Sequence, residues 1–198
     1  MMNQYFPGAT VVGIAFNEGA ILAAERRYTY GNYIVSKNVQ KVFPITDNTA
    51  AACAGMLGDM QVLVRNVQSL IKIKQLETRR VLGPGAIAKL MSVLMFQNRM
   101  FPLLTQVIVG GFDKKTEIYV LDPIGSIIPD KYSSVGTGEA IAIGVIENEY
   151  SPTITKDQAE TLAVKAIKSA IQRDSTSGDG VDLLVITKNG MESKSISF

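Results

Sequence analysis

The sequence contains no histidine, no tryptophan and a single cysteine, Cys53, among its 198 residues. The absence of histidine excludes Ser-His-Asp and Cys-His hydrolytic sites within this chain, and it removes the usual ligands of zinc and haem. A lone cysteine cannot form an internal disulfide bond, which fits a reducing cytoplasm. Any hydrolytic reaction must therefore take its base from Lys, Asp, Glu or a terminal amine.

Long apolar runs and a strong charge of one sign are also missing. No apolar run approaches the ~20 residues that a membrane helix needs, and the N-terminus lacks the pattern of a secretion signal. The formal net charge of +2 gives no footprint for nucleic acid. Apolar residues make up 46% of the chain, enough for a large core. We therefore expect one domain in the cytoplasm, with neither a membrane span nor a nucleic-acid partner.

The apolar pattern predicts an order of strands, two helices, strands, two helices and strands. Strands are predicted at 10–16, 20–25, 33–36, 42–46, 49–54, 104–110, 117–122, 126–133, 181–187 and 192–197. Helices are predicted at 59–75, 85–100 and 140–146, and a fourth begins at the capping box of Thr155 and Gln158. Strands 33–36 and 42–46 should form a hairpin, and helix 140–146 should be buried nearly all round. This order predicts a four-layer αββα sandwich of class α+β, in which helix pairs flank two stacked antiparallel sheets.

The first apolar segment, Gly-Ala-Thr-Val-Val-Gly at 8–13, has the pattern of a processing junction followed by a buried strand. Residues 1–9 are expected to be a leader, and residues 10–198 a single domain. A threonine that stands first in a chain carries both a nucleophilic hydroxyl and a base, because its α-amine has a pKa of roughly 8. Here alanine follows Gly8, and the threonine comes one place later, at Thr10.

Three further features carry possible chemistry. Lys41 lies among extended apolar residues, where it is either a buried, paired lysine or an edge lysine that points to water. Glu25 ends a predicted strand beside two arginines, where a surface ion pair is the alternative. The loop at 173–180, Arg-Asp-Ser-Thr-Ser-Gly-Asp-Gly, either is a plain turn or presents hydroxyls and carboxylates to a site.

Taken together, these segments resemble the β-type subunits of the 20S proteasome, particularly the archaeal ones, which belong to the N-terminal nucleophile hydrolases. The resemblance extends from Ala9 to about Thr187. It rests on GATVVG at 8–13, AERR at 24–27, SK at 36–37, KVF at 41–43, AG at 54–55, GD at 58–59, GG at 110–111, DPIG at 122–125 and RDSTSGDG at 173–180.

The resemblance implies a role for each matching residue. Lys41 matches the lysine that lowers the pKa of the nucleophilic hydroxyl, and Glu25 matches its acidic partner. Asp174 and Ser177 match residues that orient the terminal amine and its proton path. Thr137 stands where the family usually has serine, so a hydroxyl is kept.

Substrate-binding positions follow from the same resemblance. The backbone N–H of Gly55 matches the oxyanion donor, and Thr29 matches a residue that pairs with the substrate backbone as an added strand. The pocket for the residue before the cut maps to Tyr28, Val39, Phe43, Cys53, Leu57 and Gln61. Tyr28 and Leu57 are larger than expected there, and they are predicted to fill the pocket.

Counting without gaps from Gly13 through Lys41 to Asp174 places Ala9 at the position of the nucleophile. Three explanations remain open: a poorly active or silent subunit, an active peptidase that uses Thr10 after leader removal, or an alanine introduced to trap a precursor. The second requires a one-residue register shift, because side chains alternate along a strand. Outside the family, the alternative is a soluble α+β binding domain without chemistry.

No cofactor or metal is implied, because the base is an amine and the oxyanion donor a backbone amide. The implied partners are other β-type and α-type subunits in stacked seven-membered rings, an unfolded polypeptide substrate and a separate ATPase cap. Helices 59–75 and 85–100 carry more apolar surface than one domain needs. We expect them to face neighbouring subunits through Met95, Phe96, Met100 and Phe101.

Overall fold

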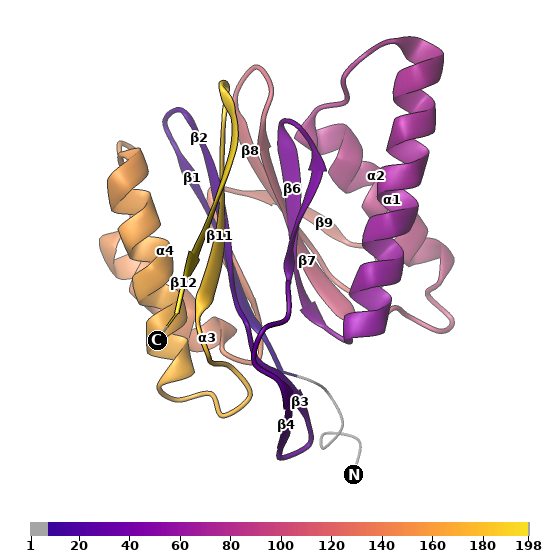
Figure 1. Cartoon of the computed structure of the whole chain (residues 1–198). Coiled ribbons are helices and arrows are strands. Elements are labelled where there is room, and N and C mark those ends of the chain that lie inside the picture. The colour runs from indigo at the N-terminus through magenta and orange to yellow at the C-terminus, as the bar shows by residue number, and fades with distance from the viewer. Residues whose placement is uncertain (1–7, 198) are drawn as a thin grey trace.

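Two stacked antiparallel sheets form the centre of the molecule in a computed structural model that describes residues 8–197 (Figure 1). The first sheet has the order β10 (Tyr132–Gly136), β1 (Thr10–Phe16), β2 (Gly19–Glu25), β11 (Val181–Thr187), β12 (Gly190–Ile196). The second has the order β5 (Val42–Thr46), β6 (Thr49–Gly55), β7 (Thr105–Phe112), β8 (Thr116–Leu121), β9 (Ile127–Asp130). A separate hairpin is formed by β3 (Tyr28–Tyr30) and β4 (Tyr33–Ser36).

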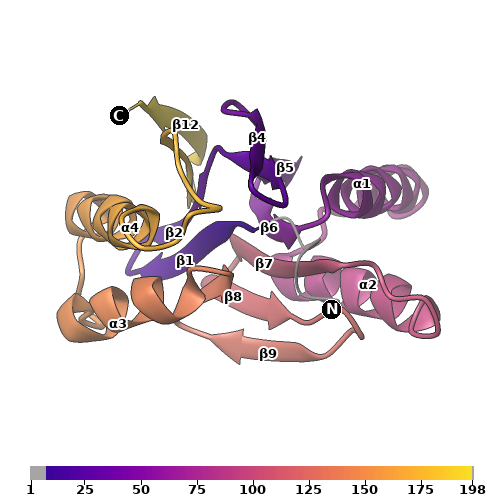
Figure 2. The same cartoon turned by 90° about the horizontal axis from the view of Figure 1, so that it is seen from below.

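Each sheet is covered on its outer face by a pair of helices (Figure 2). Helices α3 (Glu139–Glu149) and α4 (Lys156–Ile171) pack on the first sheet, and α1 (Leu57–Thr78) and α2 (Pro84–Gln97) pack on the second. The predicted four-layer α+β sandwich is thereby confirmed. Within residues 8–197, no helix is long and apolar enough to cross a membrane.

Strand β1 is buried on both faces, and its side chains alternate between two cores. Val11 lies in the apolar cluster between the sheets, whereas Val12 and Ile14 lie in the cluster between the first sheet and its helices. Close stacking requires small residues at the crossing points: a Cβ on Gly13 would lie 2.7 Å from Ile108 Cγ2 of the opposite sheet. The alternation decides which residues near the start of β1 face which layer.

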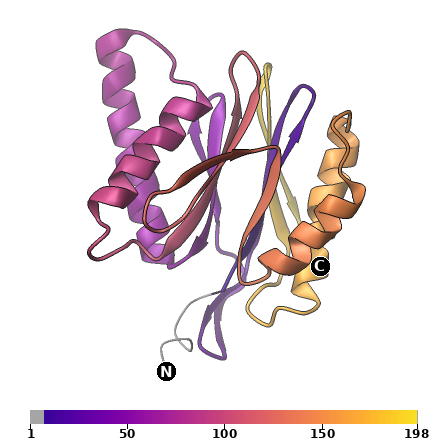
Figure 3. The ribbon, with the colours of Figure 1, turned by 180° about the vertical axis from the view of Figure 1, so that it is seen from behind.

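The predicted hairpin of 33–36 with 42–46 is wrong. Strand β4 pairs with β3, a strand that was not among those predicted, and β5 pairs with β6. The tight turn between β3 and β4 contains Gly31 at φ +56°, a conformation that glycine adopts without strain. Figure 3 shows from behind that this hairpin projects below the sheets.

Three other sequence expectations need correction. The extended segment 126–133 is divided at Lys131 between β9 of one sheet and β10 of the other. Helix α3 is not buried nearly all round: of its residues, Ala142 and Ile146 are buried. Met95 faces the protein's own core rather than a neighbour, because its position on α2 points it toward the second sheet.

Candidate active site

A buried ion pair lies between the end of β2 and the start of β5. The Lys41 ammonium donates to Glu25 Oε1 and, over 2.5 Å, to the backbone carbonyl of Arg27. Glu25 Oε2 accepts from the backbone N–H groups of Arg27 (2.7 Å) and Gly178 (3.0 Å). The side chains of Lys41 and Glu25 are 2% and 0% exposed, so the edge lysine and the surface ion pair are both excluded.

Burial governs the charges of this pair. It raises the pKa of Glu25 and lowers the pKa of Lys41, while the attraction between the two groups opposes both changes. An ammonium with a lowered pKa holds its proton less tightly than an exposed lysine does. The pair could therefore assist proton transfer from a hydroxyl placed beside it.

Ala9 carries a methyl group where the resemblance expects that hydroxyl. Its side chain belongs to the apolar cluster between the sheets, together with Val42, which follows Lys41, and Ala54. Its carbonyl accepts from the backbone N–H of Thr137 at 2.8 Å and lies 3.3 Å from the Thr137 hydroxyl. A methyl group can neither attack a carbonyl nor bond to an ammonium, so residue 9 supplies no nucleophile.

The Thr10 side chain faces the helices rather than the space between the sheets. Its hydroxyl lies 2.8 Å from the Ser177 hydroxyl, and a Cβ on Gly138, just before α3, would lie 2.2 Å from it. Because Ser177 gives its single proton to Asp174, Thr10 is the donor in the pair with Ser177. Within residues 8–197, no hydrogen bond joins Thr10 to Lys41.

The carboxylate of Asp174 accepts hydrogen bonds from three hydroxyl groups near Ala9. Its Oδ2 accepts from Thr137 (2.5 Å) and Ser177 (2.7 Å), and its Oδ1 accepts from the hydroxyl (2.7 Å) and the backbone N–H (3.0 Å) of Thr176. Burial alone would raise the pKa of Asp174, but these hydrogen bonds hold it below its usual range. The sequence analysis named Asp174, Thr137 and Ser177 as site residues, but it did not single out Thr176.

Arg27 fixes the loop that carries these groups. Its guanidinium pairs with Asp179 at 2.8 Å and donates to the backbone carbonyl of Ser175 at 3.0 Å. Gly178 packs against the same guanidinium, since a Cβ there would lie 2.3 Å from the central carbon of Arg27. The AERR motif includes Arg27 in the family pattern, but only the tertiary structure shows that Arg27 anchors a loop 148 to 152 positions away.

Gly55 lies beside a cavity of about 290 Å³ next to Ala9. Its φ is +134°, and a Cβ would lie 2.1 Å from the Leu104 carbonyl oxygen, so only glycine fits at the end of β6. Gln106, which sequence reasoning did not single out, accepts from the backbone N–H of Gly136 at 3.0 Å. The cavity is lined by Ala9, Ala54, Gly55, Leu104, Thr105, Gln106, Pro123, Gly136 and Thr137.

The six residues predicted to form the pocket before the cut do not line this cavity. Cys53 is fully buried, and burial raises the pKa of its thiol to about 12. Phe43 and Leu57 pack against the core beneath α1 and α2, whereas Gln61 is exposed. The remaining two, Tyr28 and Val39, are half-buried, and Thr29 is buried with a hydroxyl that has no hydrogen-bond partner among residues 8–197.

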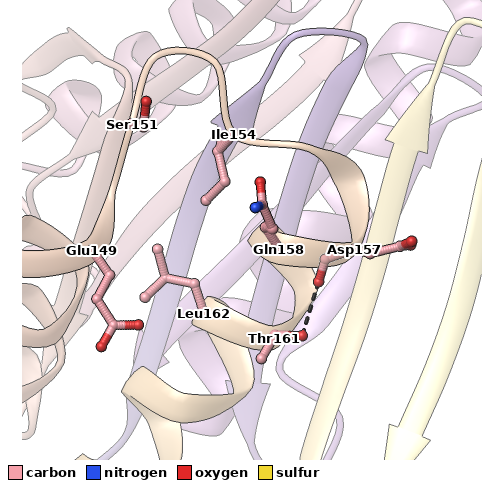
Figure 4. Close-up of a pocket in the computed structure, with 7 residues that line it drawn as sticks. All are labelled: Glu149, Ser151, Ile154, Asp157, Gln158, Thr161 and Leu162. Atoms are coloured by element: carbon pink, nitrogen blue, oxygen red, sulfur yellow. Dashed lines mark hydrogen bonds between the residues drawn. The ribbon is translucent and has the colours of Figure 1, made fainter.

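Another pocket, of about 440 Å³, lies in the opposite part of the molecule, where α3 meets α4 (Figure 4). Its apolar side chains come from Ile154 and Leu162, and its polar ones from Glu149, Ser151, Asp157, Gln158 and Thr161. Glu149 already pairs with Lys165. This pocket contains no buried ion pair of the kind that Lys41 and Glu25 form, so we place the candidate site beside Ala9.

Comparison with known proteins agrees with the geometry. The profile described as "Proteasome subunit" matches residues 5–186. The chain is 51% identical over 191 residues to "Proteasome subunit beta 1" of Nitrosopumilus maritimus, covering 96% of each chain. It is 48% identical over 184 residues to the protein of that name from Cenarchaeum symbiosum, covering 93% of this chain and 95% of that protein. It is 42% identical over 187 residues to the protein of that name from Ignicoccus hospitalis, covering 94% of each chain. The resemblance predicted from the sequence is confirmed: the chain belongs to the proteasome subunit family, among its β-type members.

Proposed function

We propose that this chain is a β-ring subunit of the proteasome core whose own cleft is catalytically silent. It would form part of the chamber wall in which another β-type chain cuts unfolded polypeptide by threonine-type peptide hydrolysis. The observation that carries the proposal is the methyl group of Ala9, in a site where Lys41, Glu25, Asp174 and the hydroxyls are all present.

Assembly follows from the outer surface of α1 and α2. Large apolar side chains are exposed there, in the link between the two helices and after the end of α2, which is costly unless a partner covers them. They are Val62, Leu70, Ile73, Leu76, Val81, Val93, Phe96, Met100 and Phe101. We assign them to contacts with α-type and β-type subunits in stacked seven-membered rings, with an ATPase cap at a distance, in the cytoplasm.

The second candidate is an active threonine endopeptidase that uses Thr10 after removal of residues 1–9. It is favoured by the chain of hydrogen bonds from Thr10 through Ser177 to Asp174, which could carry a proton away from the hydroxyl. It is disfavoured by orientation, since Thr10 and Ala9 face opposite sides of β1. Bringing Thr10 to Lys41 would need a register shift that turns every following side chain over.

Intact mass of the subunit from the assembled particle separates these candidates. The silent subunit should keep the residues before Ala9 and take up no threonine-directed covalent inhibitor. A chain that begins at Thr10 and carries the inhibitor would contradict the proposal. A particle in which this chain is absent would contradict the role in assembly.

A further inference from the structure

Thr176 is the one hydroxyl of the Asp174 network that the family resemblance does not assign. Its hydroxyl and its backbone N–H both donate to Asp174 Oδ1, at 2.7 and 3.0 Å. Two donors on one oxygen fix the rotation of the carboxylate, so that Oδ2 is left to accept from Thr137 and Ser177. Thr137 in turn binds the Ala9 carbonyl, and Ser177 binds Thr10. The orientation of Asp174 therefore depends on Thr176.

Thr176 also packs against the residue before Ala9. A Cβ on Gly8 would lie 1.6 Å from Thr176 Oγ1 and 2.2 Å from Thr176 Cβ. A new rotamer could move the hydroxyl away, but Cβ is bonded to the backbone and stays where it is. Lack of space next to Thr176 therefore excludes a side chain at position 8.

We propose that Thr176 is a positioning residue for the junction around residue 9: its side chain restricts position 8 to glycine, and its two donors turn Asp174 toward Thr137 and Ser177. Through these partners Thr176 holds residues 8, 9 and 10 in line with the cleft. The inference rests on the proposed function, in which this junction is cut once residue 9 carries a hydroxyl.

The role of the Thr176 hydroxyl is tested in an Ala9→Thr chain. The rate of leader removal is measured by intact mass at a series of pH values. Thr176→Val keeps the shape and removes the donor, and Thr176→Ser keeps the donor. We expect the valine variant to be cut at least about tenfold more slowly. The acid limb of its pH–rate profile should lie at higher pH, because loss of a hydrogen-bond donor raises the pKa of Asp174. The serine variant should stay within about twofold of the parent. Equal rates in all three, or equal slowing of both variants with an unchanged pH profile, would overturn this role.

The steric part is tested in the native chain by thermal unfolding, without any cleavage. Gly8→Ala should lower Tm by several degrees, since backbone must move to admit the new Cβ. Gly58→Ala is the matched control, because a Cβ there meets nothing within 4 Å. Thr176→Gly removes the blocking Cβ, so Gly8→Ala should cost less in its presence than alone. A Gly8→Ala chain as stable as the control, or a loss that Thr176→Gly leaves unchanged, would overturn the assignment.

The two proposals fail in different ways. An Ala9→Thr chain that is never cut would refute the missing hydroxyl as the cause of silence. The unfolding experiment would still decide the role of Thr176, because it uses the native chain and needs no cleavage.

Discussion

At the start of β1, the two faces of the strand present different side chains to a possible reaction. Ala9 lies on the side between the sheets and lines the cavity, but it gives only a methyl group. On the helix side lies the Thr10 hydroxyl, bonded to Ser177, and within residues 8–197 no hydrogen bond joins it to Lys41. One step along a strand exchanges the faces. The comparison teaches that a threonine near the right place in the sequence is not a nucleophile unless it faces the right layer.

Of the substitutions proposed here, Ala9→Thr should have the largest effect, because it removes the difference between the two faces of β1. It returns a hydroxyl to the position where the family resemblance expects the nucleophile, and it should switch on leader removal and peptide turnover. Loss of a nucleophile typically lowers kcat by about 10⁶-fold, so we expect a gain of at least about 10³-fold over the native chain. Intact mass measures leader removal, and hydrolysis of a fluorogenic peptide measures the gain in turnover. Ala9→Val is the control; if the valine chain gains as much activity, the activity does not come from residue 9.

Lys41→Met should destabilise the native chain even though no reaction is lost. The substitution leaves Glu25 as a buried carboxylate without its cation, which typically costs about 3–5 kcal/mol. The free energy of unfolding in denaturant measures this. Lys115→Met is the matched control, because that lysine is 78% exposed and 3.7 Å from Glu117, and it should cost at most about 1 kcal/mol.

A second variant keeps the Lys41 result interpretable. Glu25→Gln combined with Lys41→Met leaves no unpaired charge, so the double variant should be more stable than Lys41→Met alone. A double variant that is less stable than Lys41→Met would show that the charge of Glu25 is satisfied by its two backbone donors and not by the lysine.

Thr10→Val tests the other face of β1, where the Thr10 hydroxyl lies. It removes the hydrogen bond to Ser177, which should cost about 1 kcal/mol and lower Tm by about 2–4 °C. In the Ala9→Thr chain the gained turnover should survive this change, since Thr10 faces the helices. Complete loss of turnover at normal stability would instead make Thr10 part of the chemistry.

Asp179→Asn should have the smallest effect, and one that depends on pH. The Arg27 guanidinium holds the pKa of Asp179 below its usual range, so the carboxylate stabilises the folded state above the unfolded pKa of about 3.9. This contribution is lost as the pH falls through the lower, folded pKa. We expect the variant to be about 0.5–1 kcal/mol less stable at pH 7, with the difference shrinking toward zero below pH 4. A difference that does not change with pH would point to packing rather than charge.

Much of this site could be predicted from the sequence, because the family motifs place Lys41, Glu25, Asp174, Ser177 and Thr137 on segments that the fold brings together. Alternation along the first strand also predicted that residues 9 and 10 face opposite sides. The sandwich followed from the order of the apolar patterns alone.

The remaining errors concern pairings and faces that local patterns do not determine. Strand β4 fits β3 or β5 by composition, and the turn at Gly31 decides. Met95 has the same apolar character as Met100, but Met95 lies on the face of α2 that packs into the core, whereas Met100 follows the end of α2 at Gln97 and is exposed. Thr176 lay unnoticed in the loop because its role depends on contact with Gly8, which is 168 positions away.

The most direct test of the account is the place where a threonine-directed covalent inhibitor attaches in an assembled Ala9→Thr particle. Peptide mapping by tandem mass spectrometry locates the adduct. The account predicts attachment at residue 9 in that particle and none anywhere in the native chain. Attachment at Thr10, in either chain, would contradict it.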